Sequence, residues 1–152
     1  MVSGKWKAYN SVKEFAGDGT IDFDTDAFEM RLFLSTSNCN TLTHSVLADL
    51  TNEHAVANGY APLTLTGVTW AQTGGSGKFD SDDAIWTAAG GDMVAHFAVI
   101  IRKGTVNGVL NALVAVCRLD VAPADKTATN GNTFEVRIAA AGILTLDGAT
   151  TD

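Results

Sequence analysis

Apolar and polar residues alternate along several short segments of the chain, which is the pattern of β-strands with one face on a core. The clearest segment is Phe28–Leu34, where every second residue from Phe28 onward is apolar. The preceding residues, Ile21–Phe28, alternate with aspartates in the same way, and strict alternation returns at Phe134–Ile138. We therefore predict half-buried strands in these segments.

Two longer segments, Met93–Ile101 and Val109–Leu119, are mostly apolar and lack this alternation. A glycine-containing turn, Lys103–Gly108, separates them. Strands covered on both faces have this composition. We expect the two segments to form an antiparallel pair at the centre of the core.

Two further strands are expected, and turn residues separate the strands throughout. Leu63–Trp70 alternates apolar residues with threonine and is interrupted at Gly67, a predicted bulge, and Gly142–Leu146 forms the last strand. Asn58-Gly59 and Asn130-Gly131 are turn signals.

Only one segment has a helical pattern. In Thr43–Glu53, Val46, Leu47 and Leu50 fall at helical spacing, which predicts a short helix. Trp6–Phe15 fits either a short helix or an irregular strand.

Together these segments predict an all-β fold, an antiparallel β-sandwich or jelly roll of about eight strands with one short helix. The chain has 152 residues, with 15 Gly, 2 Pro and only 18% charged residues, which suits strands and tight turns. We predict one domain over residues 1–152, with an N-terminal arm at 1–18 and a flexible tail at 147–152.

The net charge of −7 disfavours several partners. Basic residues are scattered rather than clustered, so we expect no direct contact with nucleic acid and none with an anionic membrane. No apolar run approaches the ~20 residues that span a bilayer. The first residues lack the apolar centre of a signal peptide, so we expect synthesis in a cytoplasm.

The cysteines and histidines show no metal-binding spacing. Cys39 and Cys117 belong to no C-x-x-C pair, and we expect free thiols, with a disulfide between them as the alternative. His44, His54 and His96 match no zinc pattern. We expect His96, which lies in an apolar segment, to have a hydrogen-bond partner rather than a metal.

Two acidic clusters are candidates for chemistry. Asp22–Asp26 begins like an EF-hand loop, but Ala27 replaces the required glycine and Phe33 the required glutamate. A solvated turn is the simpler interpretation, with a weak Ca²⁺ site as the alternative. Asp80, Asp82 and Asp83 form the second cluster, which we also interpret as solvent-facing. A glycosidase acid pair is its alternative.

No nucleotide-binding or hydrolase motif accompanies these clusters. Thr73–Lys78 looks like a phosphate loop only in part, because Phe79 follows the lysine and no βαβ pattern surrounds it. A G-x-S-x-G motif is absent from the sequence. We therefore predict a protein that is not an enzyme and needs no cofactor.

Aromatic residues suggest where contacts form. Trp70 and Trp86 end strand-like runs and are expected in the core or under a loop, whereas nothing local buries Trp6. Aromatic side chains are enriched in subunit interfaces. The predicted subunit contacts are Trp6, Tyr9 and Phe15, and the predicted loop contacts are Asp82, Asp83 and Trp86.

Several segments, in order, resemble a family of small virion proteins of tailed bacteriophages. Gly19–Asp26 resembles the family's G-x-I-D-L-D-T-D stretch, and Phe28–Leu34 continues it. His96, Ile101–Lys103 and Arg118–Asp125 depart from the family pattern. The other matching segments are Asn58–Tyr60, Lys78–Trp86, Gly91–Ile100, Asn130–Phe134 and Ala140–Leu146.

The resemblance implies a structural part of the phage particle, made in the bacterial cytoplasm and located in the virion, and it supplies no catalytic residues. Our leading hypothesis is a capsid decoration protein that binds the major capsid protein on the outer head surface as a trimer or other symmetric oligomer. The alternatives are a tail or fibre module that binds a host glycan or protein, and an enzyme such as a glycan hydrolase.

Overall fold

The structure is a computed structural model that describes residues 4–119 and 125–147. In these residues the chain forms fourteen short strands, all paired antiparallel, with one α-helix and one 3-10 turn. The predicted all-β class is confirmed. The strands are more numerous and shorter than predicted, and they form several small sheets that do not close on one another. Across the described residues, no helix is long and apolar enough to cross a membrane.

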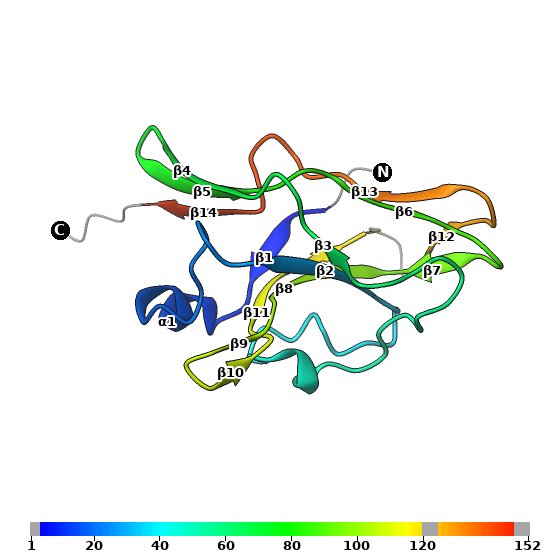
Figure 1. Cartoon of the computed structure of the whole chain (residues 1–152), viewed down its shortest axis with the longest axis horizontal. Helices are drawn as coiled ribbons and strands as arrows, with labels where there is room; N and C mark the ends of the chain where they lie inside the picture. The colour runs from blue at the N-terminus through cyan, green and yellow to red at the C-terminus, as the bar shows by residue number, and fades with distance from the viewer. Residues whose placement is uncertain (1–3, 120–124, 148–152) are drawn as a thin grey trace.

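The largest sheet has five strands in the order β1-β11-β8-β2-β3 and crosses the middle of the molecule (Figure 1). Val99 of β8 lies opposite Val116 on one side and Arg31 on the other, so β8 and β11 are central neighbours, as predicted. The strand bounds are β1 Trp6–Ala8, β2 Phe28–Phe33, β3 Leu63–Thr64, β8 Phe97–Arg102 and β11 Leu113–Arg118.

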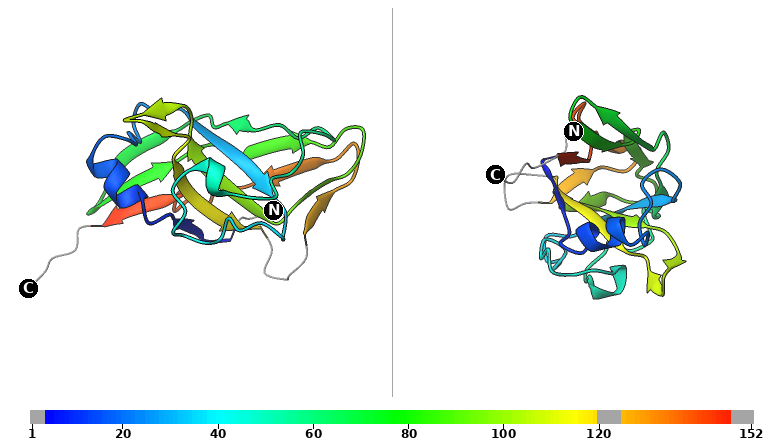
Figure 2. Two further views of the ribbon diagram at one scale, coloured as in Figure 1. Left: turned by 90° about the horizontal axis from the view of Figure 1, so that it is seen from below. Right: turned by 90° about the vertical axis from the view of Figure 1, so that its left-hand side faces the viewer.

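Smaller sheets lie along one side of the five-stranded sheet and beyond its ends (Figures 1 and 2). One has three strands in the order β14-β5-β4, and the others are two-stranded pairs. The three-stranded sheet comprises β4 Thr69–Thr73, β5 Ser76–Asp80 and β14 Leu144–Asp147. The pairs are β6 Ala84–Thr87 with β13 Thr133–Val136, β7 Met93–Ala95 with β12 Lys126–Ala128, and β9 Thr105–Val106 with β10 Val109–Leu110.

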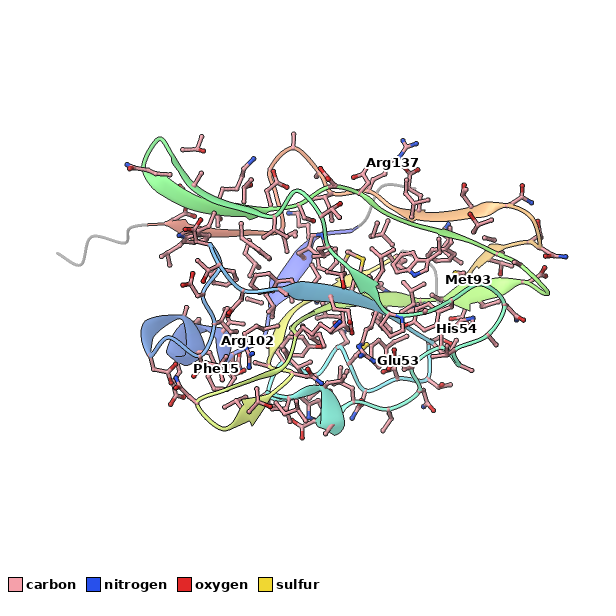
Figure 3. All side chains as sticks on the ribbon, in the orientation of Figure 1. Phe15, Glu53, His54, Met93, Arg102 and Arg137 are labelled. Atoms are coloured by element: carbon pink, nitrogen blue, oxygen red, sulfur yellow. The ribbon has the colours of Figure 1, made fainter. Side chains whose placement is uncertain are left out.

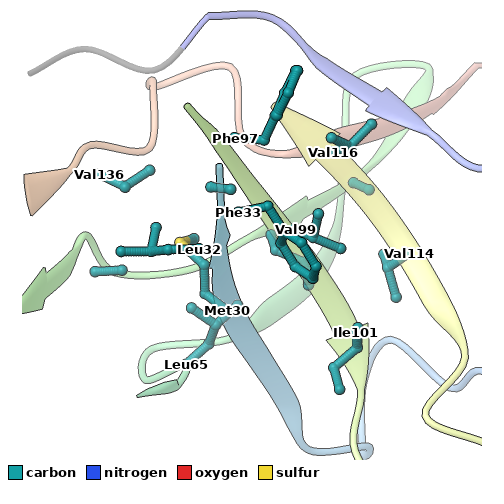
Figure 4. Close-up of a cluster of buried hydrophobic side chains, with 14 of the residues drawn as sticks. Met30, Leu32, Phe33, Leu65, Phe97, Val99, Ile101, Val114, Val116 and Val136 are labelled. Atoms are coloured by element: carbon teal, nitrogen blue, oxygen red, sulfur yellow. The ribbon is translucent and has the colours of Figure 1, made fainter. Parts of the chain in front are cut away.

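The core forms on both faces of the five-stranded sheet. All six residues of β8 and five of the six in β11 are buried, as the apolar composition of these segments predicts. Figure 4 shows valine, leucine and aromatic side chains from β2, β8 and β11 meeting in one cluster. β2 was predicted to be half-buried, but only Arg31 in it is partly exposed. This strand is therefore covered on both faces.

Residues 52–60 cover the second face of β2, and polar contacts join this segment to the strand. The Arg31 guanidinium lies 2.6 Å from the Glu29 carboxylate and 3.1 Å from that of Glu53. The Tyr60 hydroxyl donates to Glu53 at 2.7 Å and accepts the Leu32 N–H at 3.1 Å. Buried polar and charged groups in folded proteins are nearly always hydrogen-bonded or paired. These bonds explain why Glu29, a charged residue, is buried on β2.

The predicted single strand Met93–Ile101 is wrong in one respect, because it breaks at His96. Residues before the break form β7 and pair with β12, whereas residues after it form β8 and pair with β2 and β11. The His96 N–H donates to the Phe33 carbonyl at 2.8 Å, and the His96 carbonyl accepts the Leu119 N–H at 2.8 Å. Its imidazole Nε2 accepts from Arg118 at 3.2 Å, so His96 has the predicted hydrogen-bond partner.

The predicted helix Thr43–Glu53 is also wrong, since only the 3-10 turn η1, Leu47–Asp49, forms there. The Asp49 carboxylate accepts the N–H groups of Ser45 and Val46 at 3.0 and 3.2 Å. Leu47 N–H donates instead to the Asn111 carbonyl at 3.0 Å. Tertiary hydrogen bonds therefore take the backbone groups that a helix would use.

The alternation at Ile21–Phe28 does not mark a strand before Phe28. Ile21 and Phe23 are buried, but the segment is a turn in which Asp22 Oδ1 accepts the Asp24 N–H at 2.9 Å. Local bonds of this kind replace a strand ladder. Trp6–Phe15, left open between helix and strand, contains β1 followed by the start of α1, Val12–Gly17.

Candidate interaction surface around helix α1

Helix α1 is short because local residues limit it at both ends. Its N-cap Ser11 makes no side-chain cap bond, and at the C-terminal end the Asp18 Oδ1 accepts the Thr20 N–H at 2.8 Å. Val12 is buried and anchors the helix to the core, whereas Phe15 is half-buried. The helix lies at the same end of the molecule as the β9–β10 hairpin and the three-stranded sheet (Figures 1 and 2).

Two apolar hollows flank this helix. The first, which we call the hairpin groove, has a volume of about 490 Å³ and separates α1 from the β9–β10 hairpin. The second, which we call the edge groove, has a volume of about 670 Å³ and separates α1 from β14. The apolar walls of the hairpin groove are Phe15, Val46, Leu47, Val109 and Leu110. Those of the edge groove are Val12, Ile21, Phe23, Trp70, Leu144 and Leu146.

Each groove has a strongly exposed leucine at its wall. Leu110 of the hairpin groove is 58% exposed and Leu146 of the edge groove 67%. Among the described residues only two other large apolar side chains are at least half exposed, Val56 and Ile85, and they line neither groove. Exposed apolar surface gathered at one place marks an interaction surface more often than single exposed residues do.

An aromatic cluster forms the floor of the edge groove. Phe23 stacks on Trp70 with ring centres 5.0 Å apart, and Phe79 lies 4.8 Å from Phe23. The indole of Trp70 also covers Gly77, where an added Cβ would lie 2.9 Å from the ring. The rings therefore pack against one another and form a continuous apolar wall.

Carboxylates surround the edge groove. Asp22 and Lys13 line it, and four further carboxylates, Glu14, Asp18, Asp24 and Asp26, lie nearby in α1 and the turn that follows. The pKa of Asp18 is lowered by its hydrogen bonds with Thr20, and that of Asp22 by bonds with Thr25 and Asp24. Both side chains therefore stay ionised at neutral and mildly acidic pH.

The predicted subunit contacts occupy different environments. Phe15 lines the hairpin groove. Trp6 pairs opposite Cys117 and packs partly against the core. Tyr9 is fully buried, and its hydroxyl donates to the Cys39 carbonyl at 2.5 Å, so it offers no surface to a second copy in this structure. Burial also raises the pKa of Tyr9.

The predicted loop contacts lie away from both grooves and make internal bonds. Trp86 is 5% exposed and donates from Nε1 to the Ala61 carbonyl at 2.8 Å. Asp82 accepts from the Thr66 hydroxyl at 3.0 Å, and Asp83 accepts the Ile138 N–H at 2.7 Å. These three residues therefore fasten neighbouring loops, and Trp86 presents little surface to a ligand.

The other candidate groups are spread over the molecule. Figure 3 places Glu53 and His54 together in the segment that covers β2, away from Phe15 and Arg102 near the hairpin groove. Among the residues that the structure describes, no group of three or more His, Cys, Asp and Glu is arranged to hold a metal ion. Cys39 and Cys117 are both buried free thiols.

Sequence reasoning missed most of the groove residues. Leu146 was taken as part of an ordinary last strand, and Leu110 as part of a core strand. The sequence signal was available for Leu146, because Leu144–Asp147 alternates leucine with polar residues next to the polar end of the sequence. For Leu110 no signal existed, since its exposure depends on the hairpin formed by β9 and β10.

No protein-family model matches the chain, and neither a curated protein nor a solved structure matches it.

Proposed function

We propose that this chain is a non-enzymatic structural protein of a tailed-phage particle, most simply a capsid decoration protein with a β-sandwich-like body. The resemblance to small virion proteins over most of residues 19–146 carries the proposal. Its mechanism is burial of apolar surface against neighbouring subunits of the shell, which many copies on one lattice strengthen together. The major capsid protein is the proposed partner, and a trimer or other symmetric oligomer the proposed state.

The surface around α1 supports this role. Two apolar grooves, each with an exposed leucine, lie at one end of the molecule. A part that sits outside the shell and away from packaged DNA tolerates a net charge of −7. The contacts of Asp82, Asp83 and Trp86 described above favour decoration over a glycan-binding loop.

Immunogold electron microscopy of purified particles tests the proposal, with antibodies raised against the purified chain. We expect label over the head surface. Label on the tail alone would refute decoration and favour the tail or fibre alternative. Absence of the chain from washed particles would refute a structural role altogether. Light scattering of the purified chain adds its oligomeric state, and a stable trimer is the expected result.

A further inference from the structure

We propose that the edge groove binds an extended segment of a partner protein, in which apolar and basic residues alternate, and that this segment pairs with the free edge of β14. The inference rests on the proposed structural role only for the origin of the segment, which is an extended arm or loop of the shell protein.

The strand edge is the first observation. In the described part of the chain, β14 is the outer strand of its sheet and pairs with β5 alone. Its residues Leu144, Thr145 and Leu146 also line the edge groove. An unpaired edge presents N–H and C=O groups that a further strand can pair with.

β14 is short, but it lacks three other devices that protect edge strands, namely lysine, proline and a bulge. Natural edges carry lysine, proline or a bulge, which prevent pairing with other chains. The sequence Leu144-Thr-Leu-Asp147 has neither lysine nor proline, and its register with β5 is regular from Leu144 to Asp147. Its one charged residue, Asp147, is already hydrogen-bonded to the Ser76 hydroxyl of β5. An unpaired edge on which two exposed or half-exposed leucines alternate with polar residues fits a strand that binds a partner.

The apolar wall of the edge groove determines which residues the partner segment needs at every second position. Side chains of an added strand alternate between its two faces, so every second residue would face the wall formed by Ile21, Phe23 and Trp70. This wall is apolar and is braced by the stack of Phe23 on Trp70. The inward residues of the partner are therefore apolar and of the size of valine or leucine.

The negative charge beside the groove determines which residues the partner segment needs at its outward-facing positions. In residues 12–26 there are five carboxylates and one basic residue, Lys13. Asp22, at the groove itself, stays ionised because its turn hydrogen bonds lower its pKa. Basic residues at the outward positions would meet this field, which extends about 10 Å at moderate salt. The complementary segment is therefore basic as well as apolar.

The same charges argue against a second copy of this chain at the edge groove. Antiparallel pairing of β14 with β14 of another molecule would bring together two identical sets of Asp22, Asp147 and the α1 carboxylates. Like charges across an interface are costly. Self-association through this edge is therefore disfavoured and serves as an alternative outcome of the test.

Titration of the full chain with synthetic peptides tests the inference. The probe is acetyl-Lys-Val-Lys-Val-Lys-Val-Lys-amide, and the controls are its glutamate counterpart and a version N-methylated at alternate residues, which cannot complete a strand ladder. We expect NMR shifts at residues 144–147 and in α1, with affinity that falls as NaCl rises from about 0.05 to about 0.5 M. Both control peptides should bind roughly tenfold more weakly or worse.

Matched variants locate the site. Leu146→Lys should weaken the lysine peptide roughly tenfold, whereas Ile85→Lys, on a leucine-sized exposed residue of β6 outside the groove, should leave affinity unchanged. The double variant Glu14→Lys, Asp24→Lys should also weaken binding of the lysine peptide, because it reverses the charge of two residues near the groove. Neither carboxylate has a side-chain hydrogen bond among those found for the described residues, so the fold should be kept. Unchanged thermal unfolding in each variant shows that the fold is intact.

Three results would overturn the inference: equal binding of the lysine and glutamate peptides, equal effects of Leu146→Lys and Ile85→Lys, or light scattering that shows dimers lost on Leu146→Lys. The last result would assign the edge to a second copy. Label over phage heads together with no peptide binding would reject this inference and leave the proposed function standing.

Discussion

Replacement of Gly59 by alanine should destabilise the protein far more than replacement of Gly108, although both glycines have a positive φ. Gly59 has φ +83° and Gly108 φ +77°, so the backbone strain of an added Cβ is similar, about 1 kcal/mol at each. The surroundings differ. A Cβ at Gly59 would lie 2.0 Å from the Thr87 carbonyl oxygen, whereas nothing lies within 4 Å of one at Gly108.

The clash at Gly59 involves backbone at the end of β6, which cannot rotate away as a side chain would. The Ala89 N–H also donates to the Asn58 carbonyl at 3.1 Å, so the two segments are tied at this point. Overpacking of this kind costs about 1–3 kcal/mol. Added to the strain, this gives a loss of about 2–4 kcal/mol for Gly59→Ala, against about 1 kcal/mol for Gly108→Ala.

Urea unfolding followed by tryptophan fluorescence measures both losses, and equal slopes would show that the variants share one unfolded state. The comparison isolates the clash because Gly108→Ala carries the strain alone. Equal losses in the two variants would refute the assignment of the Asn58-Gly59-Tyr60 turn to close packing against β6.

Three further predictions concern other parts of the fold. Tyr60→Phe should lower the free energy of unfolding by about 1.5–3 kcal/mol, because its hydroxyl donates to the Glu53 carboxylate and accepts the Leu32 N–H. Tyr9→Phe should lower it by only about 1 kcal/mol, because the Tyr9 hydroxyl bonds to one neutral carbonyl. Urea unfolding measures both losses, and equal losses or the reverse order would contradict the reasoning. Burial raises the pKa of Cys39 to about 11, so its thiol stays protonated at pH 8 and should react with a disulfide reagent only after unfolding; rapid labelling of the native protein at Cys39 would be inconsistent with this. The hydrogen bonds from Ser45 and Val46 hold the pKa of Asp49 below its usual 3.8, so its stabilising contribution is complete above that value and is lost as the pH falls through the lower, folded-state pKa. Asp49→Ala should lower the free energy of unfolding by about 1 kcal/mol at pH 7, and its stability should fall less in acid than that of the parent. Parallel curves of stability against pH would contradict this prediction.

The sequence correctly predicted strands and turns where the local hydrophobic or turn pattern and the tertiary contacts favour the same structure. The antiparallel pair of β8 and β11 followed from two apolar segments, and the turn at Asn130-Gly131 separates β12 from β13 as expected. Local chemistry and tertiary packing point the same way at these positions, which is why pattern alone was sufficient. The predicted strand Leu63–Trp70 with a bulge at Gly67 is wrong, because the chain divides there, at φ +58°, into β3 and β4, which belong to different sheets.

The failures occurred where distant residues took over local hydrogen-bonding groups. The apolar spacing of Val46, Leu47 and Leu50 is helical, but the backbone of Val46 and Leu47 pairs with Asn111 and Ala112, nearly half the chain away. Met93–Ile101 is continuous in composition, yet contacts from Phe33 and Leu119 divide it at His96. Nothing within a short window of sequence encodes such partners.

The candidate surface could be predicted only in part for the same reason. Phe15 was expected at a contact and lines the hairpin groove, whereas Tyr9, three positions before Val12, turns into the core. Asp147, expected at the start of a flexible tail at 147–152, belongs instead to β14, and residues 148–152 of that predicted tail lie outside the described residues. The proposed loop contacts depended on exposure, which sequence alone does not give for Trp86.

The position of β1 has a consequence for synthesis. This strand is synthesised well before its partner in the sheet, β11, which ends at Arg118. At roughly 5–20 residues per second, about ten seconds pass before the two strands can meet. During that interval Trp6 and Tyr9 have no sheet to join, so the nascent chain must keep this apolar segment from other chains until β11 has been made.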